Sequence, residues 1–248
     1  MRILENIVYS YSDERNNKLD LYIPENECSA SFVYFHGGGL ECGDKADVEF
    51  AKGLAQKGVA VASANYRMYP NAVYPEFIRD AAAAVNWVFE HIEEYGGKKK
   101  IFVGGSSAGA YLSMMLCFDK KYLMPYGINA DDISGFIHDA GQPTSHFNIL
   151  REKGFDSRRI IVDETAPLYH VTQNLNYPPM LFIVSDNDMT NRLEQTMLMM
   201  KTLEHFDNDM SKISLKIMEN SSHCSYLNTD LKKGNLFEKI LCDFITDN

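Results

Sequence analysis

The stretch IFVGGSSAG, residues 101–109, decides how this chain is predicted to fold. Ile101–Val103 is a short apolar run typical of a buried strand, and Ala108–Phe118 has the pattern of a helix. The five residues from Gly105 to Gly109 fit Gly-x-Ser-x-Gly, in which a strand turns sharply into a helix with a serine at the turn. The stretch therefore predicts a strand–turn–helix unit with Ser107 at its apex.

Glycine is needed at both ends of this turn for a physical reason. A serine in so sharp a turn has a strained backbone, and side chains at Gly105 and Gly109 would collide with neighbouring backbone. The turn also places Ser107 at a helix N-terminus, where free N–H groups and the macrodipole favour developing negative charge. We interpret Ser107 as a nucleophile; the alternative is an ordinary glycine and serine turn.

Strand and helix patterns alternate on both sides of this unit. Ser31–Phe35 and Val59–Ala64 are nearly continuous apolar runs, as expected for parallel strands covered on both faces. Apolar residues recur at helical spacing over Asp44–Lys57, between these two strands. The same patterns predict strands at Ile7–Ser10, Lys18–Ile23, Gly135–Ile137, Met180–Val184 and Ile213–Met218, and helices at Glu76–Glu94, Thr190–Phe206 and Leu231–Ile245. We therefore predict an α/β protein with a mostly parallel sheet of about eight strands flanked by helices on both faces.

The length of 248 residues favours a single domain over residues 1–248. The stretch Gly141–Asn176 interrupts the alternation, being polar and containing Pro143, Gly154 and Pro167. Long connections in compact domains are usually lids or carry short helices. We expect a lid-like insertion here rather than a second domain.

Composition and charge exclude several classes of function. The chain is 45% hydrophobic and 23% charged, as in globular proteins, and its net charge of −10 repels nucleic acid and anionic membranes. No apolar run approaches the roughly 20 residues of a membrane span, and Met1–Asn6 lacks a signal-peptide pattern, so we expect a cytoplasmic protein. The five cysteines contain no Cys-x-x-Cys pair and are expected to be free thiols, with no metal and no organic cofactor. A homo-oligomer remains open.

A second glycine-rich segment, His36–Gly39, follows the strand Ser31–Phe35 directly. Consecutive glycines favour a loop whose backbone closely approaches another group. Acyl transfer from a serine requires N–H donors for an oxyanion, and the amides of Gly37, Gly38 and Ala108 could supply them. A flexible loop is the alternative, and His36 itself is interpreted as an anchor of the loop.

Together these two motifs give the chain a family resemblance. It resembles α/β-hydrolase-fold esterases and lipases of the hormone-sensitive-lipase-like kind, in which an HGGG loop precedes G-x-S-x-G. The resemblance covers most of the chain and includes Ala64-Asn65-Tyr66-Arg67, Tyr74-Pro75, Asp80, Trp87 and Ala166-Pro167. It implies an α/β-hydrolase fold and a serine nucleophile.

The resemblance also implies an acid and a histidine later in the chain. In this fold the catalytic residues follow in the order Ser, acid, His. Similar esterases carry the acid in a turn resembling Gly-x-x-Asp, which maps Ser185 to its first position and Asp188 to the acid. Asp186 is the alternative acid, with a turn hydrogen bond as its other expected role. His223 follows the strand Ile213–Met218, where this fold places its histidine.

Three features depart from the family pattern. Ser106 precedes the nucleophile where similar esterases often have an acid, and Leu40 stands where a tryptophan often follows the glycines. The 35 residues before His36 leave little room for the N-terminal helical cap of many relatives. His138 and Asp139 end the strand at Gly135–Ile137, where they could face the site, but we expect them to pack beneath the insertion.

These observations predict a serine carboxylesterase that hydrolyses short-chain acyl esters, with acetylated sugars among the candidates. An amide-cleaving hydrolase of the same fold, similar to kynurenine formamidases or to the prolyl oligopeptidase catalytic domain, is the first alternative. The second is a non-catalytic binding protein with a hydrolase fold. The sequence alone leaves the natural substrate open.

Overall fold

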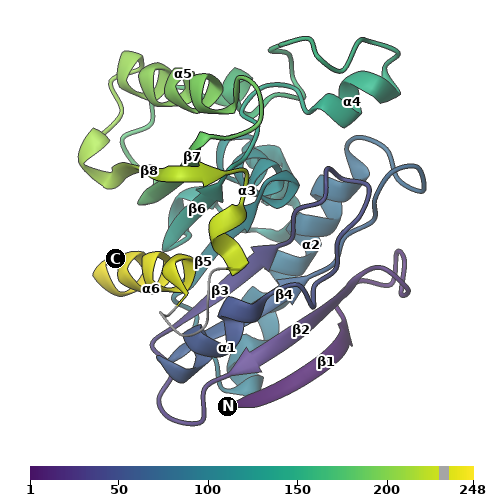
Figure 1. Ribbon diagram of the computed structural model, residues 1–248. Helices are drawn as coiled ribbons and strands as arrows, with labels where there is room; N and C mark the ends of the chain where they lie inside the picture. Colours follow the sequence, from purple (N-terminus) through teal and green to yellow (C-terminus); the bar gives the residue numbers. More distant parts are fainter. Residues whose placement is uncertain (229–234) are drawn as a thin grey trace.

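The computed structural model places one sheet of eight strands between two layers of helices (Figure 1). It describes residues 1–228 and 235–248. The strands lie in the order β1-β2-β4-β3-β5-β6-β7-β8. The β1–β2 and β2–β4 pairs are antiparallel and all other neighbouring pairs are parallel. The predicted α/β architecture, with its mostly parallel sheet, is confirmed.

The bounds of the elements are as follows. The strands are β1 (Arg2–Val8), β2 (Lys18–Ile23), β3 (Ala30–Phe35), β4 (Val59–Ala64), β5 (Ile101–Ser106), β6 (Gly135–Asp139), β7 (Met180–Asn187) and β8 (Ile213–Ser222). The α-helices are α1 (Glu49–Gln56), α2 (Glu76–His91), α3 (Ala108–Phe118), α4 (Phe147–Glu152), α5 (Arg192–His205) and α6 (Leu236–Asp247).

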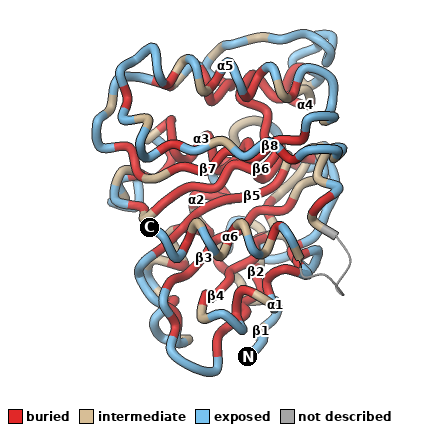
Figure 2. Tube along the Cα trace, turned by 60° about the vertical axis from the view of Figure 1, so that its left-hand side comes forward, coloured by how far each residue is buried: buried red, intermediate tan, exposed pale blue. Residues whose placement is uncertain are grey.

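Two hydrophobic cores lie on opposite faces of the sheet (Figure 2). Side chains alternate along β5, so that Ile101 and Val103 belong to one core and Phe102 belongs to the other. Helices α2, α3 and α5 cover the first face, whereas α1 and α6 cover the second, where Phe50 packs edge-on against Phe237. Burial on both faces explains why the central strands are continuous apolar runs.

The parallel strands extend beyond the apolar runs that predicted them. In the sheet register Ser106 on β5 lies opposite Asp139 on β6, and Asn187 on β7 lies opposite Ser222 on β8. Backbone pairing with a neighbouring strand continues through these polar residues, which an apolar pattern cannot detect. The extra residues bring polar side chains to the carboxyl edge of the sheet, where ligands bind in open α/β folds.

The first predicted strand was misplaced, since β1 covers Arg2–Val8 instead of Ile7–Ser10. It is an edge strand with mostly exposed or half-buried residues, and a register shift falls between Leu4 and Ile7. Pairing with β2 determines where β1 begins and ends. Because β1 is little buried and its register is irregular, apolar and polar residues alternate only weakly along it.

Three predicted helices begin later than expected: α5 begins at Arg192 instead of Thr190, and α1 and α6 begin later by a larger margin. The chain from 44 to 48 forms a loop before α1, because the Lys45 ammonium is drawn inward to pair with Asp20 at 2.9 Å and the Ser63 hydroxyl bonds the Lys45 carbonyl. Helix α6 begins after Asn235, whose side chain accepts a hydrogen bond from the Glu238 backbone N–H. The part of the predicted Leu231–Ile245 helix over 231–234 lies outside the described residues.

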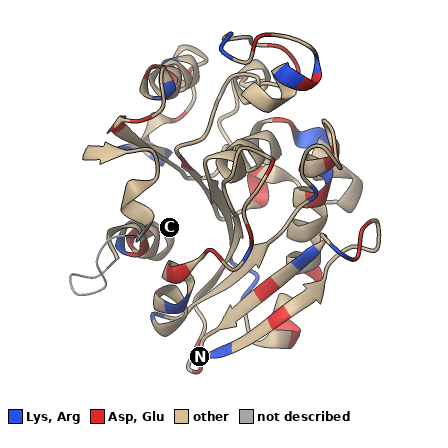
Figure 3. Cartoon of the chain, turned by 45° about the vertical axis from the view of Figure 1, so that its right-hand side comes forward, with Lys and Arg blue, Asp and Glu red and all other residues tan. Residues whose placement is uncertain are grey.

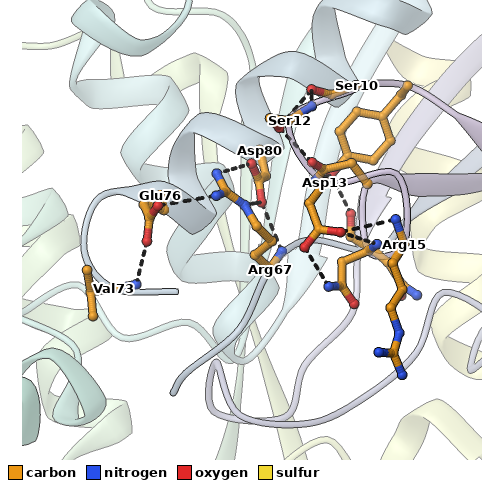
Figure 4. A network of polar contacts seen from close by, with 12 residues as sticks. Ser10, Ser12, Asp13, Arg15, Arg67, Val73, Glu76 and Asp80 are labelled. Atoms are coloured by element: carbon orange, nitrogen blue, oxygen red, sulfur yellow. Dashed lines mark hydrogen bonds and ion pairs between the residues drawn. The ribbon is translucent and has the colours of Figure 1, made fainter. Parts of the chain in front are cut away.

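An ion-pair network fixes the segment that follows β4 (Figure 4). The Arg67 guanidinium binds both carboxylate oxygens of Asp80 at 2.8 Å and also contacts Glu76 at 3.2 Å. Such bidentate pairs are stronger than single ion pairs and fix orientation as well. The network attaches the start of α2 to the loop after β4, which carries Tyr66.

Charged residues lie on the helices, the loops and the strands toward both ends of the sheet, whereas the central strands β3, β4 and β5 contain none (Figure 3). Among the helices of the described chain, none is long and apolar enough to cross a bilayer.

Candidate active site

Ser107 lies at the apex of the tight turn between β5 and α3. Strand β5 lies in the middle of the sheet (Figure 1). Its φ of 55° and ψ of −113° are strained values for a residue with a side chain. A Cβ added at Gly109 would lie 1.9 Å from the Phe35 carbonyl oxygen, and a Cβ added at Gly105 would lie 2.5 Å from the carbonyl carbon of Gly109. The steric need for both glycines, predicted from the sequence, is confirmed.

His223 bridges Ser107 and Asp188. Its Nε2 atom lies 2.9 Å from Ser107 Oγ, and its Nδ1 atom lies 2.6 Å from Asp188 Oδ1. The Asp188 side chain is 1% exposed and that of His223 is 25% exposed. The structure thus brings together the Ser107 hydroxyl, the His223 imidazole and the Asp188 carboxylate from three loops that are far apart in the chain. This arrangement is the one that a nucleophile, its base and an orienting acid require.

The turn after β7 distinguishes the two candidate acids. Asp188 also accepts backbone hydrogen bonds, from Ser185 N–H at 3.2 Å and Met189 N–H at 2.7 Å. Asp186 instead points to solvent and accepts from the backbone N–H groups of Asn220 and Ser221. The structure therefore places Asp188 on the histidine and gives Asp186 the turn-bonding position.

The electrostatics of Asp188 fit an ionised orienting group. Burial alone raises the pKa of Asp188, but the hydrogen bond and charge of His223 and the two backbone donors outweigh it, so the net shift is downward. The Ser185 hydroxyl donates to the Ser222 carbonyl at 2.9 Å, which ties the acid-bearing turn to the histidine loop. Ser185 thus takes part in positioning both segments.

The glycine loop packs directly on the nucleophile turn. A Cβ added at Gly37 would lie 3.3 Å from Ser107 Cβ, and Gly38 has a φ of +107° that disfavours any side chain. Tyr66 stacks on the His36 ring, and its hydroxyl donates to the His36 carbonyl at 2.9 Å. His36 Nδ1 in turn bonds the Gly37 carbonyl at 2.7 Å. His36 thus occupies the anchoring position expected for it, beside backbone that contacts the serine.

A cavity of about 610 Å³ opens beside Ser107. Its wall includes apolar side chains that the sequence did not single out: Tyr34, Phe50, Phe147, Met189 and Leu227. Phe147 comes from the 141–176 insertion, whose Asn148 side chain donates to the Gly39 carbonyl at 2.9 Å. The sequence gives no sign of Tyr34 and Phe50 at the site, because Tyr34 lies in a fully buried strand and Phe50 belongs to the buried apolar face of α1.

The expected position of Asp139 beneath the insertion is wrong. Its side chain is fully buried behind the nucleophile turn, where Ser106 and Tyr226 donate hydrogen bonds to its two carboxylate oxygens. His138 points to the other face, against Phe182 and the Ser113 hydroxyl. Adjacent residues of a strand face opposite ways, and only the register with β5 shows which of them meets Ser106.

The described residues include five cysteines, and Cys224 directly follows His223. All five cysteines are free, and burial raises the pKa of the Cys224 thiol well above its usual value, which disfavours a reactive thiolate beside His223. Over residues 1–228 and 235–248, no cluster of His, Cys, Asp and Glu has the arrangement of a metal site.

Sequence comparisons find esterases and lipases among the proteins similar to this chain. The family model described as BD-FAE matches residues 19–132. A probable isoprenylcysteine alpha-carbonyl methylesterase, ICMEL1 of Arabidopsis thaliana, is 24% identical over 96% of this chain and 55% of its own length. Lipase 2 of Moraxella sp. (strain TA144) is 38% identical over 35% of this chain and 21% of its own length. The chain thus spans about half or less of these relatives.

Solved structures share the whole fold. An esterase from Thermogutta terrifontis, Est2 with propionate bound, has a TM-score of 0.78 and 21% identity, covering 97% of this chain and 93% of its own. A truncated carbohydrate esterase from gut microbiota has a TM-score of 0.79 and 18% identity, covering 100% and 96%. These structures confirm the predicted fold, and the sequence comparisons confirm the resemblance to esterases and lipases.

Proposed function

Because the chain is an α/β hydrolase related to esterases and lipases, we propose that it is a serine carboxylesterase with Ser107, His223 and Asp188 as its catalytic triad. The observation that carries the proposal is the continuous hydrogen-bonded line from Ser107 Oγ through His223 to Asp188, with distances of 2.9 and 2.6 Å. These are the contacts that a nucleophile needs with its base, and a base with its orienting acid.

The reaction proceeds in two halves. Ser107 Oγ attacks the ester carbonyl carbon while His223 Nε2 takes the hydroxyl proton, and Asp188 stabilises the imidazolium that forms. The backbone N–H groups of Gly37, Gly38 and Ala108 hold the oxyanion of the tetrahedral intermediate. His223 then gives its proton to the leaving alcohol, and water hydrolyses the acyl-enzyme by the same route. These steps use side chains and backbone amides alone.

Short acyl groups suit this site best. Ser107 and His223 line the cavity of about 610 Å³, and Phe147 of the insertion lies against Gly39 and closes one side of it beside the nucleophile. We assign the 141–176 insertion the role of a small lid on this basis. Acetyl and butyryl esters of small alcohols or sugars are the substrate class.

The test compares wild type with Ser107→Ala on p-nitrophenyl acetate and butyrate. We expect kcat to fall by about 10⁴-fold or more, because the nucleophile is lost. Ser211→Ala, which removes an exposed serine hydroxyl far from the cavity, serves as the control and should leave kcat unchanged. Equal rates for wild type and Ser107→Ala would refute the proposal.

The amide-cleaving alternative is tested on the same proteins. Kynurenine formamidases often have a tryptophan after their glycines, whereas Leu40 occupies that position here and is fully buried. We therefore expect acetyl esters to be hydrolysed with a higher kcat/KM than N-formylkynurenine. The reverse order would reassign the reaction to amide cleavage while keeping the same triad.

A further inference from the structure

Asp139 connects the two segments that carry the nucleophile and the base. It ends β6 with no exposed surface, and its carboxylate accepts hydrogen bonds from the Ser106 hydroxyl and the Tyr226 hydroxyl. Ser106 immediately precedes Ser107, and Tyr226 lies in the short helix Ser225–Asn228 that follows His223. One buried carboxylate is therefore bonded to both sides of the Ser107–His223 contact.

The direction of each hydrogen bond follows from the charge of Asp139. Burial raises its pKa to about 6, although the hydrogen bonds from Ser106 and Tyr226 oppose this, so Asp139 is ionised at neutral pH. An ionised carboxylate only accepts, hence both hydroxyls donate to it. The Ser106 oxygen is left to accept from Tyr34, whose hydroxyl lies 2.9 Å away. The hydroxyls of Tyr34, Ser106 and Tyr226 therefore all donate toward the Asp139 carboxylate, directly or through Ser106.

The backbone adds a second link to the nucleophile. The Asp139 carbonyl oxygen accepts a hydrogen bond from Ser107 N–H at 2.7 Å. Hydrogen bonds to an ionised group are stronger than neutral ones, and burial prevents water from replacing them. The turn at Ser107 and the loop at His223 are thus both attached to the end of β6.

We propose that Asp139 is a positioning residue, whose carboxylate holds the nucleophile turn and the histidine loop at the separation where Ser107 Oγ meets His223 Nε2. The inference rests on the proposed ester hydrolysis. It assigns a role to Ser106, the position where similar esterases often have an acid. Here the acid is supplied from β6, and the serine hydroxyl connects it to the turn.

A double-mutant cycle tests the link. Ser106→Ala removes the bond on the nucleophile side, and Tyr226→Phe removes the bond on the histidine side while keeping the ring beside Phe237. Each should lower kcat by about 10- to 100-fold with KM changed less than about threefold, since misplacement of reacting atoms by about 1 Å costs about 10²-fold. The two side-chain bonds act in series through one carboxylate, and the backbone bond from Ser107 N–H is present in every variant. Losing either side-chain bond therefore breaks the side-chain connection, so the double variant should be no slower than the slower single variant.

The control is Tyr9→Phe, which removes another buried tyrosine hydroxyl, bonded to the Asn65 carbonyl, and should keep the wild-type kcat. All rates are measured where circular dichroism shows the variant folded, and Ser106→Cys replaces Ser106→Ala if that variant does not fold. A wild-type kcat in either single variant, a loss confined to KM, or fully additive losses would overturn the positioning role. Retention of activity in Ser107→Ala would instead refute the esterase proposal itself.

Discussion

Replacing Asp188 by asparagine tests the acid that the sequence left undecided. Asp188 Oδ1 bonds both His223 Nδ1 and Met189 N–H, while its Oδ2 atom accepts from Ser185 N–H. An asparagine amide cannot satisfy all three donors. With its NH₂ toward His223 it selects the tautomer whose Nε2 carries the proton, which cannot accept from Ser107. With its NH₂ toward Ser185, the asparagine places a donor against the Ser185 N–H donor, and its neutral oxygen cannot stabilise the imidazolium by charge.

Either orientation removes transition-state stabilisation, so we expect kcat to fall by about 10⁴-fold, equivalent to about 5.5 kcal/mol. The matched control is Asp186→Asn in the same turn, because Asp186 is exposed and accepts hydrogen bonds from backbone amides of β8. It should change kcat by less than about twofold. The assay is p-nitrophenyl acetate hydrolysis at neutral pH. A loss below about tenfold for Asp188→Asn, or an equal loss for Asp186→Asn, would refute the assignment.

Three other changes test the packing of the site and its pH response. Gly109→Ala puts a Cβ 1.9 Å from the Phe35 carbonyl oxygen, so we expect urea denaturation to show a loss of about 1–3 kcal/mol and kcat/KM to fall about 10²-fold; normal kinetics would contradict the steric argument. Phe50→Ala should enlarge the cavity and raise the ratio of hexanoate to butyrate ester hydrolysis rates by about tenfold, because each of the two extra methylenes gains about 0.8 kcal/mol on burial. An unchanged ratio would show that the acyl chain does not bind beside Phe50. Burial lowers the pKa of His146 to about 3, whereas the pKa of a histidine in the unfolded chain is about 6.5. Below pH 6.5 the unfolded chain therefore binds a proton that the folded protein does not, and the free energy of unfolding decreases as the pH falls from about 6.5 toward 3. The asparagine side chain of His146→Asn can still accept the hydrogen bond from Asn148 N–H. Urea titrations at several pH values should show that the variant loses less unfolding free energy on acidification than wild type, by up to about 1.4 kcal/mol per pH unit, and equal slopes of stability against pH would show that His146 is not the titrating group.

Much of the fold was predictable because its signals are local. The strands β3 and β4 are buried at every residue and apolar at all but Ser31 and Ser63, and the helix after Ser107 begins and ends where its pattern predicts. The predicted bounds are wrong at β1, where pairing with β2 decides which residues form the strand, and before α1, where the ion pair between Lys45 and Asp20 holds the chain in a loop. Those interactions join residues far apart in the chain, so no window of sequence contains them.

The same distinction applies to the site. Gly105, Ser107 and Gly109 are determined by the sequence itself, because a strand that must turn sharply into a helix has steric requirements within five residues. The choice of Asp188 over Asp186, and the discovery of Asp139 behind Ser106, depended on the tertiary structure. Two carboxylates in one turn, or two residues at a strand end, differ only in the direction they face. That direction is decided by the register of parallel strands, which brings together side chains that the chain itself keeps far apart.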